Sequence, residues 1–376
     1  MYCTFLPDGR IKPGKEDFMP PKLILAINPG STSTKFGLFE EEKLLFEKTL
    51  RHTPLEMIGF EHVTDQFSFR KDLIMQELSE KNILLQSIAA VVGRGGLVKS
   101  IESGVYRVNE LMKKDLHEGK RGEHASNLGA LIADDIAANL PSAMAFIVDP
   151  VVVDELIPVA RLSGHPEIER QSIFHALNQK AVARIYASSS GKKYEELDLI
   201  IAHMGGGISV GAHRHGKVID VNNALSGEGP FSPERSGGLP SLQLVELCFS
   251  GKYTLQEVKA MLVGKGGMVA YLGTNDFREI SQRAASGDEK AALVRDAAMY
   301  QVSKEIGAMA VALEGKVDAV ILTGGLAYDE TAVQLIRKMT GFIAPVAVYP
   351  GEDELRALAF NGLLALRGEV EIKEYV

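Results

Sequence analysis

The sequence contains no tryptophan and only two cysteines, Cys3 and Cys248. Two isolated cysteines offer neither a disulfide scaffold nor a zinc knuckle, so we expect a reducing, cytoplasmic environment. No apolar run approaches the roughly 18 residues that a membrane-spanning helix needs. The chain has a formal net charge of −8, so it also lacks the surplus of Lys and Arg that is typical of nucleic-acid-binding proteins. These absences disfavour disulfide-stapled, membrane-spanning and nucleic-acid-binding proteins.

Residues 1–21 have neither the apolar core of a signal peptide nor a periodic pattern. Met19 comes just before the first strand-like run. We therefore expect residues 1–21 to be a loosely held tail, or an upstream extension of a chain that begins at Met19. The remaining length is enough for two domains, each with its own core.

Glycine, in contrast, is abundant, at 37 of 376 residues. An apolar run at 23–27 enters the polar turn NPGSTSTK, and a similar run at 197–202 enters HMGGGIS. Each unit is followed by further strands and then by alternating helices and strands. Two similar units far apart in the chain predict a duplicated α/β architecture with largely parallel strands. Periodicity lapses at Ser163–Gly164, where we expect the chain to cross between domains.

Hydrophobic periodicity and capping residues predict the main elements of both halves. Ser172 is expected to be the N-cap of a helix at 172–187. Helices are also expected at 71–81, 123–140, 290–313, 329–339 and 352–366, and strands at 88–92, 143–148, 317–322 and 346–348. Several polar, glycine-flanked motifs follow these strands. Ligands of open α/β sheets bind beyond the carboxyl ends of the strands, so these motifs are candidate binding loops.

Three glycine-containing turns stand out among them. In Asn28–Lys35, small residues let backbone N–H groups approach a phosphate, although an ordinary tight hairpin fits the same letters. Gly205–Gly207 costs about 0.5–1 kcal/mol per glycine within a strand, which favours close approach of a ligand or of another backbone. Thr323–Ala327 resembles an adenosine-binding turn, and it also fits a tight connection from strand to helix.

Arg94, Asp149 and Arg235 follow expected strands or lie in glycine-rich loops. An arginine among glycines presents its guanidinium on a loop that a planar anion can approach. A solvated loop charge is the simpler interpretation of each arginine taken alone. The joint occurrence of these residues with the glycine loops favours one anion-binding site.

Two further motifs point elsewhere but are weaker. Residues 211–218 resemble a Walker A loop, but they lack its final Ser or Thr and precede a strand. His213 and His215 could bracket a metal on one strand, but no third ligand is visible, so we expect exposed polar residues. No G-x-G-x-x-G is followed by an acidic residue at the right distance, which disfavours a nicotinamide-dependent Rossmann enzyme.

The motifs also occur in the order of a known family. After INPGSTSTK come VVGRGG, GEHASNLG, FIVDPVVVDEL, IFHALNQKA, AHMGGGIS, PERSGG, GTNDFREI and TGGLAYDE. Over residues 22–376 the chain resembles the acetate and butyrate kinases of the actin/hexokinase/hsp70-like phosphotransferase superfamily. This resemblance implies two actin-like (ribonuclease H-like) α/β domains that flank a nucleotide cleft. We expect 22–170 with 355–376 to form the N-terminal domain, and 171–354 to form the nucleotide-binding domain.

The resemblance also implies ATP and Mg²⁺ as cofactors, a short-chain carboxylate as substrate, and a homodimer or higher homo-oligomer. The implied catalytic residues are Arg94, Asp149, His175 and Arg235. The implied nucleotide-binding residues are Asn28, Ser31, Ser33, Lys35, His203, Gly205, Gly206, Gly207, Asp276, Phe277, Arg278, Gly324, Gly325, Leu326 and Ala327. The implied carboxylate-binding residues are Arg94, Gly95, Gly96, His124 and Phe174. Asp149 and Glu354 match the metal-supporting acids, with Asp353 as the alternative to Glu354.

The expected reaction is direct in-line phosphoryl transfer from ATP to the carboxylate, which gives an acyl phosphate and ADP. A carboxylate is ionised at pH 7 and needs no general base, so catalysis depends on fixed cations and donors. Arg94 would hold the carboxylate, while Arg235 and His175 would stabilise the transferring phosphoryl group. Gly95 and Gly96 stand where acetate kinases carry two valines, so we expect a wider acyl pocket that favours butyrate or a branched four- or five-carbon acid.

Three alternatives stay open at this point. An acetate or propionate kinase would carry the same motifs. A sugar or polyol kinase on the same fold would use Asp149 as the base for a hydroxyl group. A non-catalytic ATPase module would share the fold, but it would have no use for the pair of arginines.

Overall fold

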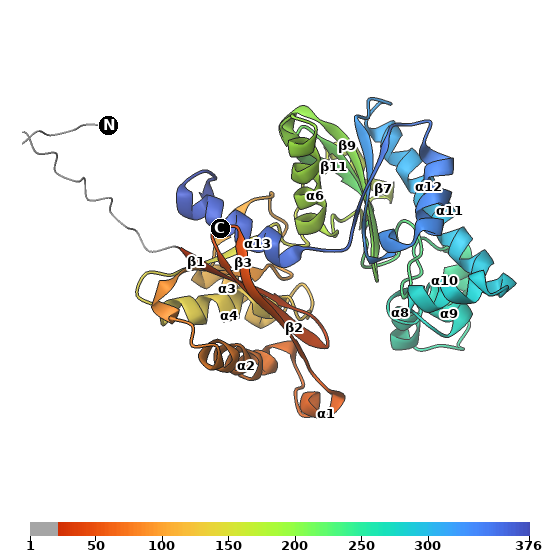
Figure 1. The fold of residues 1–376 in the computed structure, drawn as a ribbon. Helices are drawn as coiled ribbons and strands as arrows, with labels where there is room; N and C mark the ends of the chain where they lie inside the picture. The colour runs from red at the N-terminus through yellow and green to blue at the C-terminus, as the bar shows by residue number, and fades with distance from the viewer. Residues whose placement is uncertain (1–21) are drawn as a thin grey trace, which may run out of the picture.

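Two β-sheets form the framework of the computed structural model, which describes residues 22–376. Each sheet lies in its own lobe, and Figure 1 shows the two lobes side by side, joined by the segment that precedes α13. Every helix in this described range is too short or too polar to span a membrane. The expectations for residues 1–21, including a start at Met19, lie outside the described residues.

The sheet of the first lobe has the strand order β14-β5-β6-β4-β1-β2-β3. Its strands are β1 (Leu23–Pro29), β2 (Ser33–Glu40), β3 (Lys43–Arg51), β4 (Ile88–Arg94), β5 (Val105–Arg107), β6 (Met144–Val148) and β14 (Ile372–Lys373). The sheet of the second lobe has the order β11-β10-β9-β12-β13. Its strands are β9 (Asp198–Met204), β10 (Ile208–Arg214), β11 (Lys217–Val221), β12 (Ala319–Gly324) and β13 (Val346–Pro350).

The two sheets repeat one arrangement. In the first lobe β3, β2 and β1 are antiparallel neighbours, and β4 and β6 continue the sheet parallel to β1. In the second lobe β11, β10 and β9 are antiparallel neighbours, and β12 and β13 continue parallel to β9. The turns NPGSTSTK and HMGGGIS join the first two strands of each unit. The expected duplicated α/β architecture is therefore confirmed.

Helices cover both faces of the first sheet. Leu25 and Ile27 of β1 face α2 and α4, whereas the alternate residues Ile24 and Ala26 face α13. This alternation follows from the two-residue period of a strand. The helices and 3₁₀ turns of this lobe are α1 (Pro54–Met57), η1 (Val63–Gln66), α2 (Phe67–Glu80), η2 (Leu85–Ser87), α3 (Glu110–Glu118), α4 (Asn127–Ala138) and α13 (Glu354–Arg367).

The second sheet is covered in the same way. Leu199 and Ile201 of β9 face α6, whereas Ile200 and Ala202 face the layer of α11 and α12. The helices and 3₁₀ turns here are α6 (Ala176–Ser189), η3 (Tyr194–Glu196), α7 (Ser241–Cys248), α8 (Leu255–Leu262), α9 (Met268–Leu272), α10 (Phe277–Ala285), α11 (Glu289–Ala312), η4 (Gly325–Tyr328) and α12 (Glu330–Thr340). All candidate ligand loops of this half follow β9, β11 or β12, or precede α10.

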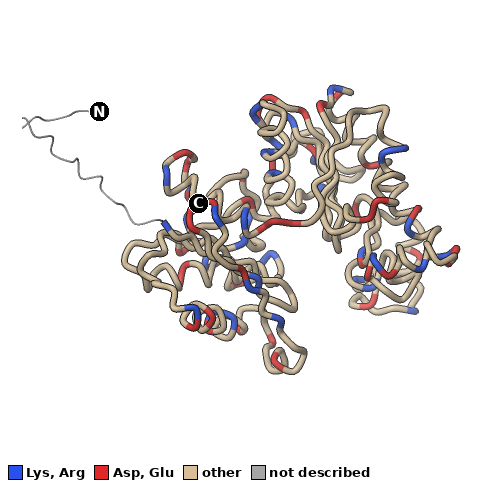
Figure 2. The backbone as a smooth tube through the Cα atoms, viewed as in Figure 1, with Lys and Arg blue, Asp and Glu red and all other residues tan. Residues whose placement is uncertain are grey.

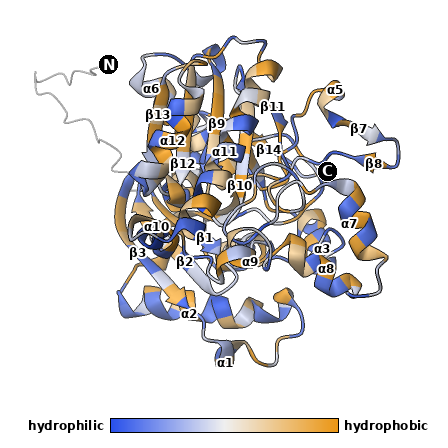
Figure 3. Ribbon diagram, turned by 90° about the vertical axis from the view of Figure 1, so that its right-hand side faces the viewer, coloured by the Kyte–Doolittle hydropathy of each residue, from blue (hydrophilic) through white to orange (hydrophobic). Residues whose placement is uncertain are grey.

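One helix start differs from the expectation, and the expected domain crossing stays a prediction. Helix α6 begins at Ala176 with His175 as its N-cap residue, because the Ser172 hydroxyl instead donates to the Val153 carbonyl at 2.7 Å. Ser163–Gly164, the expected domain crossing, lies in a small hairpin of β7 (Leu162–His165) and β8 (Ile168–Glu169). This hairpin follows α5 (Pro158–Arg161), and both project from the body of the molecule in Figure 3.

Charged residues of both signs are interspersed along the backbone of the two lobes (Figure 2). An acidic run, Glu352–Glu354, occupies the segment that joins β13 to α13 and thus links the lobes. The exact domain limits, 22–170 with 355–376 and 171–354, stay a prediction.

Candidate active site

A small cavity of about 80 Å³ is lined by residues of both lobes. Its polar lining consists of Arg94, His124, His175 and Arg235. The remaining lining is apolar: Leu97, Val151, Ile173, Phe174, Ala224 and Leu225. Five predicted site residues, the four polar ones and Phe174, therefore meet at one place although they are far apart in the chain.

His175 is a half-buried, neutral hydrogen-bonding group. Burial lowers the pKa of His175 well below its ordinary value, and the positive charges of His203, Arg235 and Arg94 lower it further. Its Nδ1 lies 2.9 Å from Oγ of Ser209. As the N-cap residue of α6, His175 is placed by the start of that helix and faces the cavity.

Arg235 reaches the cavity from the loop after β11. Its Nη1 donates to the carbonyl oxygen of Ala224, and its Nε is buried without a partner in the described part of the chain. Burial lowers the pKa of Arg235, but an arginine side chain keeps its positive charge in proteins. A Cβ at Gly207 would lie 2.0 Å from Nη1, so the glycine is required for the guanidinium to sit there. A buried guanidinium with an unpaired N–H is suited to bind an anion.

His124 completes the polar lining. Helix α4 begins at Asn127 rather than near 123, which leaves His124 in the loop before it. Its Nδ1 lies 2.8 Å from Oγ of Ser126. Burial lowers the pKa of His124, and the charges of Arg94 and Arg235 lower it further, so the ring is neutral and can contribute a hydrogen bond.

Arg94 belongs to a cluster where β1, β4 and α13 meet. Its Nη1 lies 3.2 Å from Oδ1 of Asn28 and 3.0 Å from Oε2 of Glu354. Nδ2 of Asn28 donates to the same Glu354 oxygen. Asp353, the alternative acid, caps α13 and pairs with Arg356 at 3.0 Å on the surface. The structure thus brings Glu354, and not Asp353, to Arg94.

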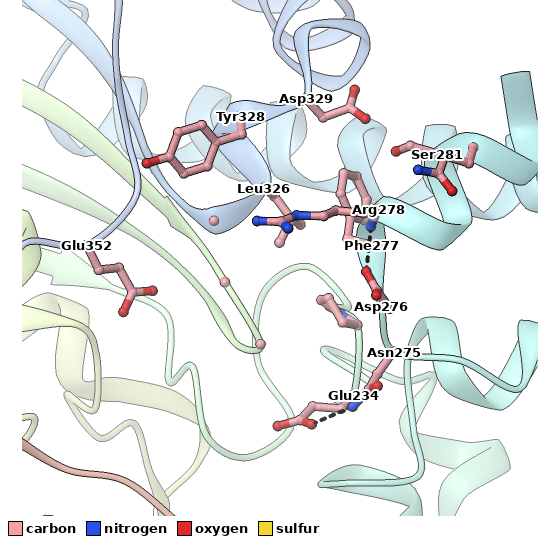
Figure 4. A pocket seen from close by; sticks show the side chains of 15 residues that line it. Glu234, Asn275, Asp276, Phe277, Arg278, Ser281, Leu326, Tyr328, Asp329 and Glu352 are labelled. Carbon is pink, nitrogen blue, oxygen red and sulfur yellow. Dashed lines mark hydrogen bonds between the residues drawn. The ribbon is translucent and has the colours of Figure 1, made fainter. Parts of the chain in front are cut away.

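A larger cavity of about 640 Å³ opens next to the β9–β10 turn, in the second lobe (Figure 4). Its lining is Gly205, Gly206, Pro233, Glu234, Asn275, Asp276, Phe277, Arg278, Ser281, Gln282, Gly325, Leu326, Tyr328, Asp329 and Glu352. All three nucleotide motifs of this half therefore contribute to one pocket. Arg278 extends across the opening in Figure 4, between Glu352 and the start of α10.

Some nucleotide-motif residues have structural tasks, and of these Asp276 also lines the pocket whereas Gly324 and Ala327 do not. The Asp276 carboxylate caps α10 by accepting from the Arg278 backbone N–H at 2.9 Å. Gly324 has a φ of +86°, and a Cβ there would lie 2.5 Å from the Met204 carbonyl oxygen. Ala327 is buried in the core of the lobe. These residues shape the wall on which a ring system would lie.

His203 connects the two cavities. Its ring is fully buried, with Nδ1 2.8 Å from Oδ1 of Asn178 and Nε2 3.0 Å from Oε1 of Glu352. Burial opposes ionisation of Glu352, but its interaction with His203 holds the pKa of this carboxyl below its ordinary value. A Cβ at Gly205 would lie 3.1 Å from Nε2 of His203, so the glycine leaves room beside this pair.

Gly95 and Gly96 do not line the small cavity. A Cβ at Gly95 would lie 2.5 Å from Cβ of Pro150, and one at Gly96 would lie 2.5 Å from Oδ1 of Asn127. The expectation that their missing side chains widen the acyl pocket stays a prediction. The glycines allow the loop after β4 to pack closely on its neighbours, which positions Leu97 at the cavity.

Asp149 is not brought to either cavity. Its Oδ1 accepts from the Gly104 backbone N–H at 2.8 Å, and its Oδ2 lies 3.7 Å from Nη1 of Arg184. Two features nevertheless fit a functional residue: a φ of +37°, which is strained for aspartate, and a buried Oδ2 without a hydrogen-bond partner among the described residues. Its catalytic and metal-binding roles stay predictions.

The first polar turn is organised by a residue that sequence reasoning missed, Arg70 of α2. The fully buried guanidinium donates to the carbonyl oxygens of Gly30 at 2.8 Å, Ser33 at 2.9 Å and Ser31 at 3.3 Å. Its described hydrogen bonds include no carboxylate, since the remaining acceptors are the Gln66 amide and a hydroxyl group. Arg70 therefore fixes the turn and leaves a buried positive charge behind it. Burial lowers the pKa of Arg70 to about 10.

Helical spacing could have revealed Arg70. It stands four and eight residues before Ile74 and Leu78, which are the other buried side chains of α2. A charged residue in line with an apolar stripe indicates a buried polar contact. Lys35, in contrast, pairs across the sheet with Glu47 at 3.3 Å, and neither it nor Ser31 and Ser33 lines the two cavities.

Comparisons with known proteins agree with this architecture. The acetokinase family model matches residues 165–347. Butyrate kinase 1 of Clostridium acetobutylicum is 58% identical over 352 residues, which cover 94% of this chain and 99% of the relative. Butyrate kinase 2 of the same organism is 56% identical with the same coverage.

Solved structures share the fold. The acetate kinase of Porphyromonas gingivalis has a TM-score of 0.74 at 20% identity, covering 92% of this chain and 100% of that chain. The acetate kinase of Entamoeba histolytica has a TM-score of 0.72 at 18% identity, covering 93% and 99%. The expected fold class is confirmed as the two-lobed α/β fold of acetate kinases. On the identity to its sequence relatives, the chain belongs to the acetokinase family.

Proposed function

We propose that the protein transfers the terminal phosphoryl group of ATP to butyrate or a branched four- or five-carbon acid, in line, to give an acyl phosphate and ADP. The observation that carries this proposal is the small cavity, where two arginines and two neutral histidines meet an apolar wall. The names of the related butyrate kinases support the same substrate class.

The polar lining suits an anionic nucleophile. A carboxylate is already ionised at pH 7, so the reaction needs fixed positive charge and hydrogen-bond donors rather than a base. Arg94 is assigned to the carboxylate, and Arg235 and His175 to the equatorial oxygens of the transferring group. A sugar or polyol acceptor would need a carboxylate base, and among residues 22–376 no Asp or Glu lines this cavity.

The apolar lining suits a short alkyl chain. Leu97, Ile173 and Leu225 contribute aliphatic side chains, and each methylene that they cover would contribute about 0.8 kcal/mol. Acetate has no methylene to bury, so the same walls favour longer acids. With Gly95 and Gly96 excluded from the lining, these walls become the basis of the chain-length preference.

ATP is assigned to the larger cavity, with its phosphates directed to the β9–β10 turn and the small cavity. Mg²⁺ usually binds through phosphates, waters and one or two carboxylates, and it neutralises charge on the phosphoryl oxygens. Residues 22–376 contain no cluster of three metal-ligating side chains, which fits a metal that arrives with the nucleotide. Glu352 and Glu354 are the carboxylates at the junction of the two cavities, and they are proposed to support it.

The experiment is trapping of the acyl phosphate with hydroxylamine, using ATP, Mg²⁺ and straight and branched acids of two to five carbons. We expect kcat/KM to rise from acetate to butyrate or isobutyrate. Acetate as the best substrate would overturn the chain-length assignment. Phosphorylation of polyols without any acyl hydroxamate would overturn the carboxylate assignment.

We also propose a cytoplasmic location and a homodimer or larger homo-oligomer. Light scattering after size-exclusion chromatography tests the assembly directly. A monomer at micromolar concentration contradicts it.

A further inference from the structure

A buried chain of hydrogen bonds ends on Nδ1 of His175. It starts at the hydroxyl of Tyr194, which lies 2.6 Å from Nδ1 of His213. His213 Nε2 lies 2.8 Å from Oε1 of Gln179, and Gln179 Nε2 lies 2.8 Å from Oγ of Ser209. The Ser209 hydroxyl then lies 2.9 Å from Nδ1 of His175. His213, expected to be an exposed polar residue, is fully buried within this chain, so that expectation is wrong.

The direction of each hydrogen bond can be derived from one fixed point. Gln179 Nε2 lies 3.1 Å from the backbone carbonyl oxygen of Ser209, which can only accept. This fixes the amide group, with its NH₂ toward Ser209 and its Oε1 toward His213. His213 must therefore carry its proton on Nε2, and its bare Nδ1 accepts from Tyr194. Burial keeps both Tyr194 and His213 neutral, since it lowers the pKa of His213 and raises that of Tyr194.

The same accounting reaches His175. Oγ of Ser209 accepts from Nε2 of Gln179 at 2.8 Å and from the His175 backbone N–H at 3.5 Å, which occupies both of its lone pairs, and it has one proton of its own to donate. Among residues 22–376, Nδ1 of His175 is the one acceptor placed for that proton. Nδ1 is then the bare nitrogen, and the ring proton must lie on Nε2. No described residue bonds to this Nε2, and the ring lines the small cavity.

The backbone is shaped for this chain. Ser209, Gly211 and His213 lie on the same face of β10, because alternate residues of a strand share a face. A Cβ at Gly211 would lie 2.7 Å from Oε1 of Gln179 and 3.2 Å from Nε2 of His213. Gln179 follows His175 by one turn of α6 and so lies over this glycine. The chain of hydrogen bonds therefore requires glycine at position 211.

We propose that Ser209, Gln179 and His213 are positioning residues that hold His175 as the Nε2–H tautomer, with this N–H directed at an anion in the small cavity. The donor role rests on the proposed function, because the anion is the transferring phosphoryl group. The tautomer itself follows from the hydrogen-bond chain alone. Such control resembles the way a carboxylate selects the tautomer of a catalytic histidine in other enzymes.

The direct test is NMR of the full chain labelled with ¹⁵N-histidine, with the His175 signal assigned by its loss in His175→Gln. We expect His175 to show a protonated Nε2 and a bare Nδ1 in the wild type, from neutral to mildly acidic pH. The groups facing this ring are His203, Arg94 and Arg235, all positive when charged, and none of them favours an imidazolium. A protonated Nδ1 would overturn the proposal.

Kinetics test whether the residues act through His175. Ser209→Ala should lower kcat by about tenfold or more, with KM for both substrates little changed, and Ser209→Thr should restore part of it. In a His175→Ala background, Ser209→Ala should lower kcat no further, because the two residues act as a unit. An equal loss in both backgrounds would show that Ser209 acts elsewhere.

Gly211→Ala is the matched variant that leaves every polar group of the chain in place. It should reproduce the kcat loss of Ser209→Ala, with part of the NMR signal moved to the other tautomer. If both variants fold, as judged by circular dichroism, and keep wild-type kcat and tautomer, the proposal fails. Wild-type protein with the expected tautomer but no acyl phosphate formation would instead overturn the proposed function alone.

Discussion

The imidazole rings of His175 and His203 lie face to face, with their centroids 3.7 Å apart and their planes 11° apart. Two stacked rings at this distance cannot both be protonated without strong repulsion. His203 lies beside the Glu352 carboxylate at 3.0 Å, whereas His175 has no acidic partner among residues 22–376. The stack therefore separates the two histidines chemically: one ring faces an acid, and the other stays neutral at the small cavity.

Acid should destabilise the protein through its buried histidines. The pKa values of His175 and His213 lie well below normal because both rings are buried. Below about pH 6.5 the unfolded chain takes up protons on these residues and the folded chain does not, so stability falls as pH falls. The expected slope is up to about 1.4 kcal/mol per pH unit for each histidine.

Urea unfolding between pH 7.5 and 5.5 measures this slope. His175→Gln should remove the share of the slope that His175 contributes. Equal slopes for the wild type and His175→Gln would contradict the neutral, buried state of His175.

Arg235→Met should lower kcat by about 10²–10³-fold, because it removes a buried donor aimed at the developing charge. Arg235→Lys should recover little, since an ammonium lacks the planar fork of donors. Rates come from the hydroxylamine assay, and thermal unfolding checks the fold. Arg107→Met, at the surface of β5, is the matched control and should keep wild-type rates. Retained activity in Arg235→Met would remove Arg235 from the reaction.

Arg70→Met should raise KM for ATP more than it lowers kcat, because the first polar turn loses both its anchor and the charge behind it. It should also cost stability, by about 2–4 kcal/mol, since several backbone carbonyls lose their buried donor. Arg70→Lys keeps the charge but loses most of the hydrogen bonds, so it separates the two effects. If Arg70→Lys and Arg70→Met raise KM equally, the charge makes no contribution and the turn geometry alone matters.

Leu97→Ala should shift the substrate preference toward longer acids. Removing this side chain enlarges the cavity at its apolar wall. We therefore expect kcat/KM for butyrate to fall about tenfold, and the ratio of kcat/KM for a five- or six-carbon acid to kcat/KM for butyrate to rise. Gly95→Ala is the comparison: its new methyl group would collide with Pro150, so we expect lower thermal stability with an unchanged order of acids. A changed order in Gly95→Ala and not in Leu97→Ala would return the chain-length role to the glycine.

The sequence predicted the site best where local chemistry is unusual. Arg94 and Arg235 could be recognised because they stand among glycines, whereas His175 was implied only by the resemblance to a known family. Contacts between distant segments could not be predicted in the same way. Gly95 meets Pro150, and Arg70 meets the turn at 30–33, only after the sheet has assembled.

Helix starts and burial show the same limit. Serine is a residue type that N-caps favour, but the hydroxyl of Ser172 donates to the Val153 carbonyl instead. The helix starts at Ala176. His213 was expected to be an exposed polar residue because the sequence shows no third ligand for a metal beside it and His215. Its burial depends on Tyr194 and Gln179, which come from other elements and cannot be inferred from the strand itself.

The position of α13 has a consequence for synthesis of the chain. This helix, Glu354–Arg367, leaves the ribosome after the other described helices, yet it covers β1, the first of the described strands. Until it emerges, one face of the first sheet keeps its apolar residues open to water. The second lobe is complete once β13 has been made. It can therefore fold while the first sheet still lacks the helix α13 that covers one of its faces. Nascent chains that stop before residue 354 should therefore depend on chaperones.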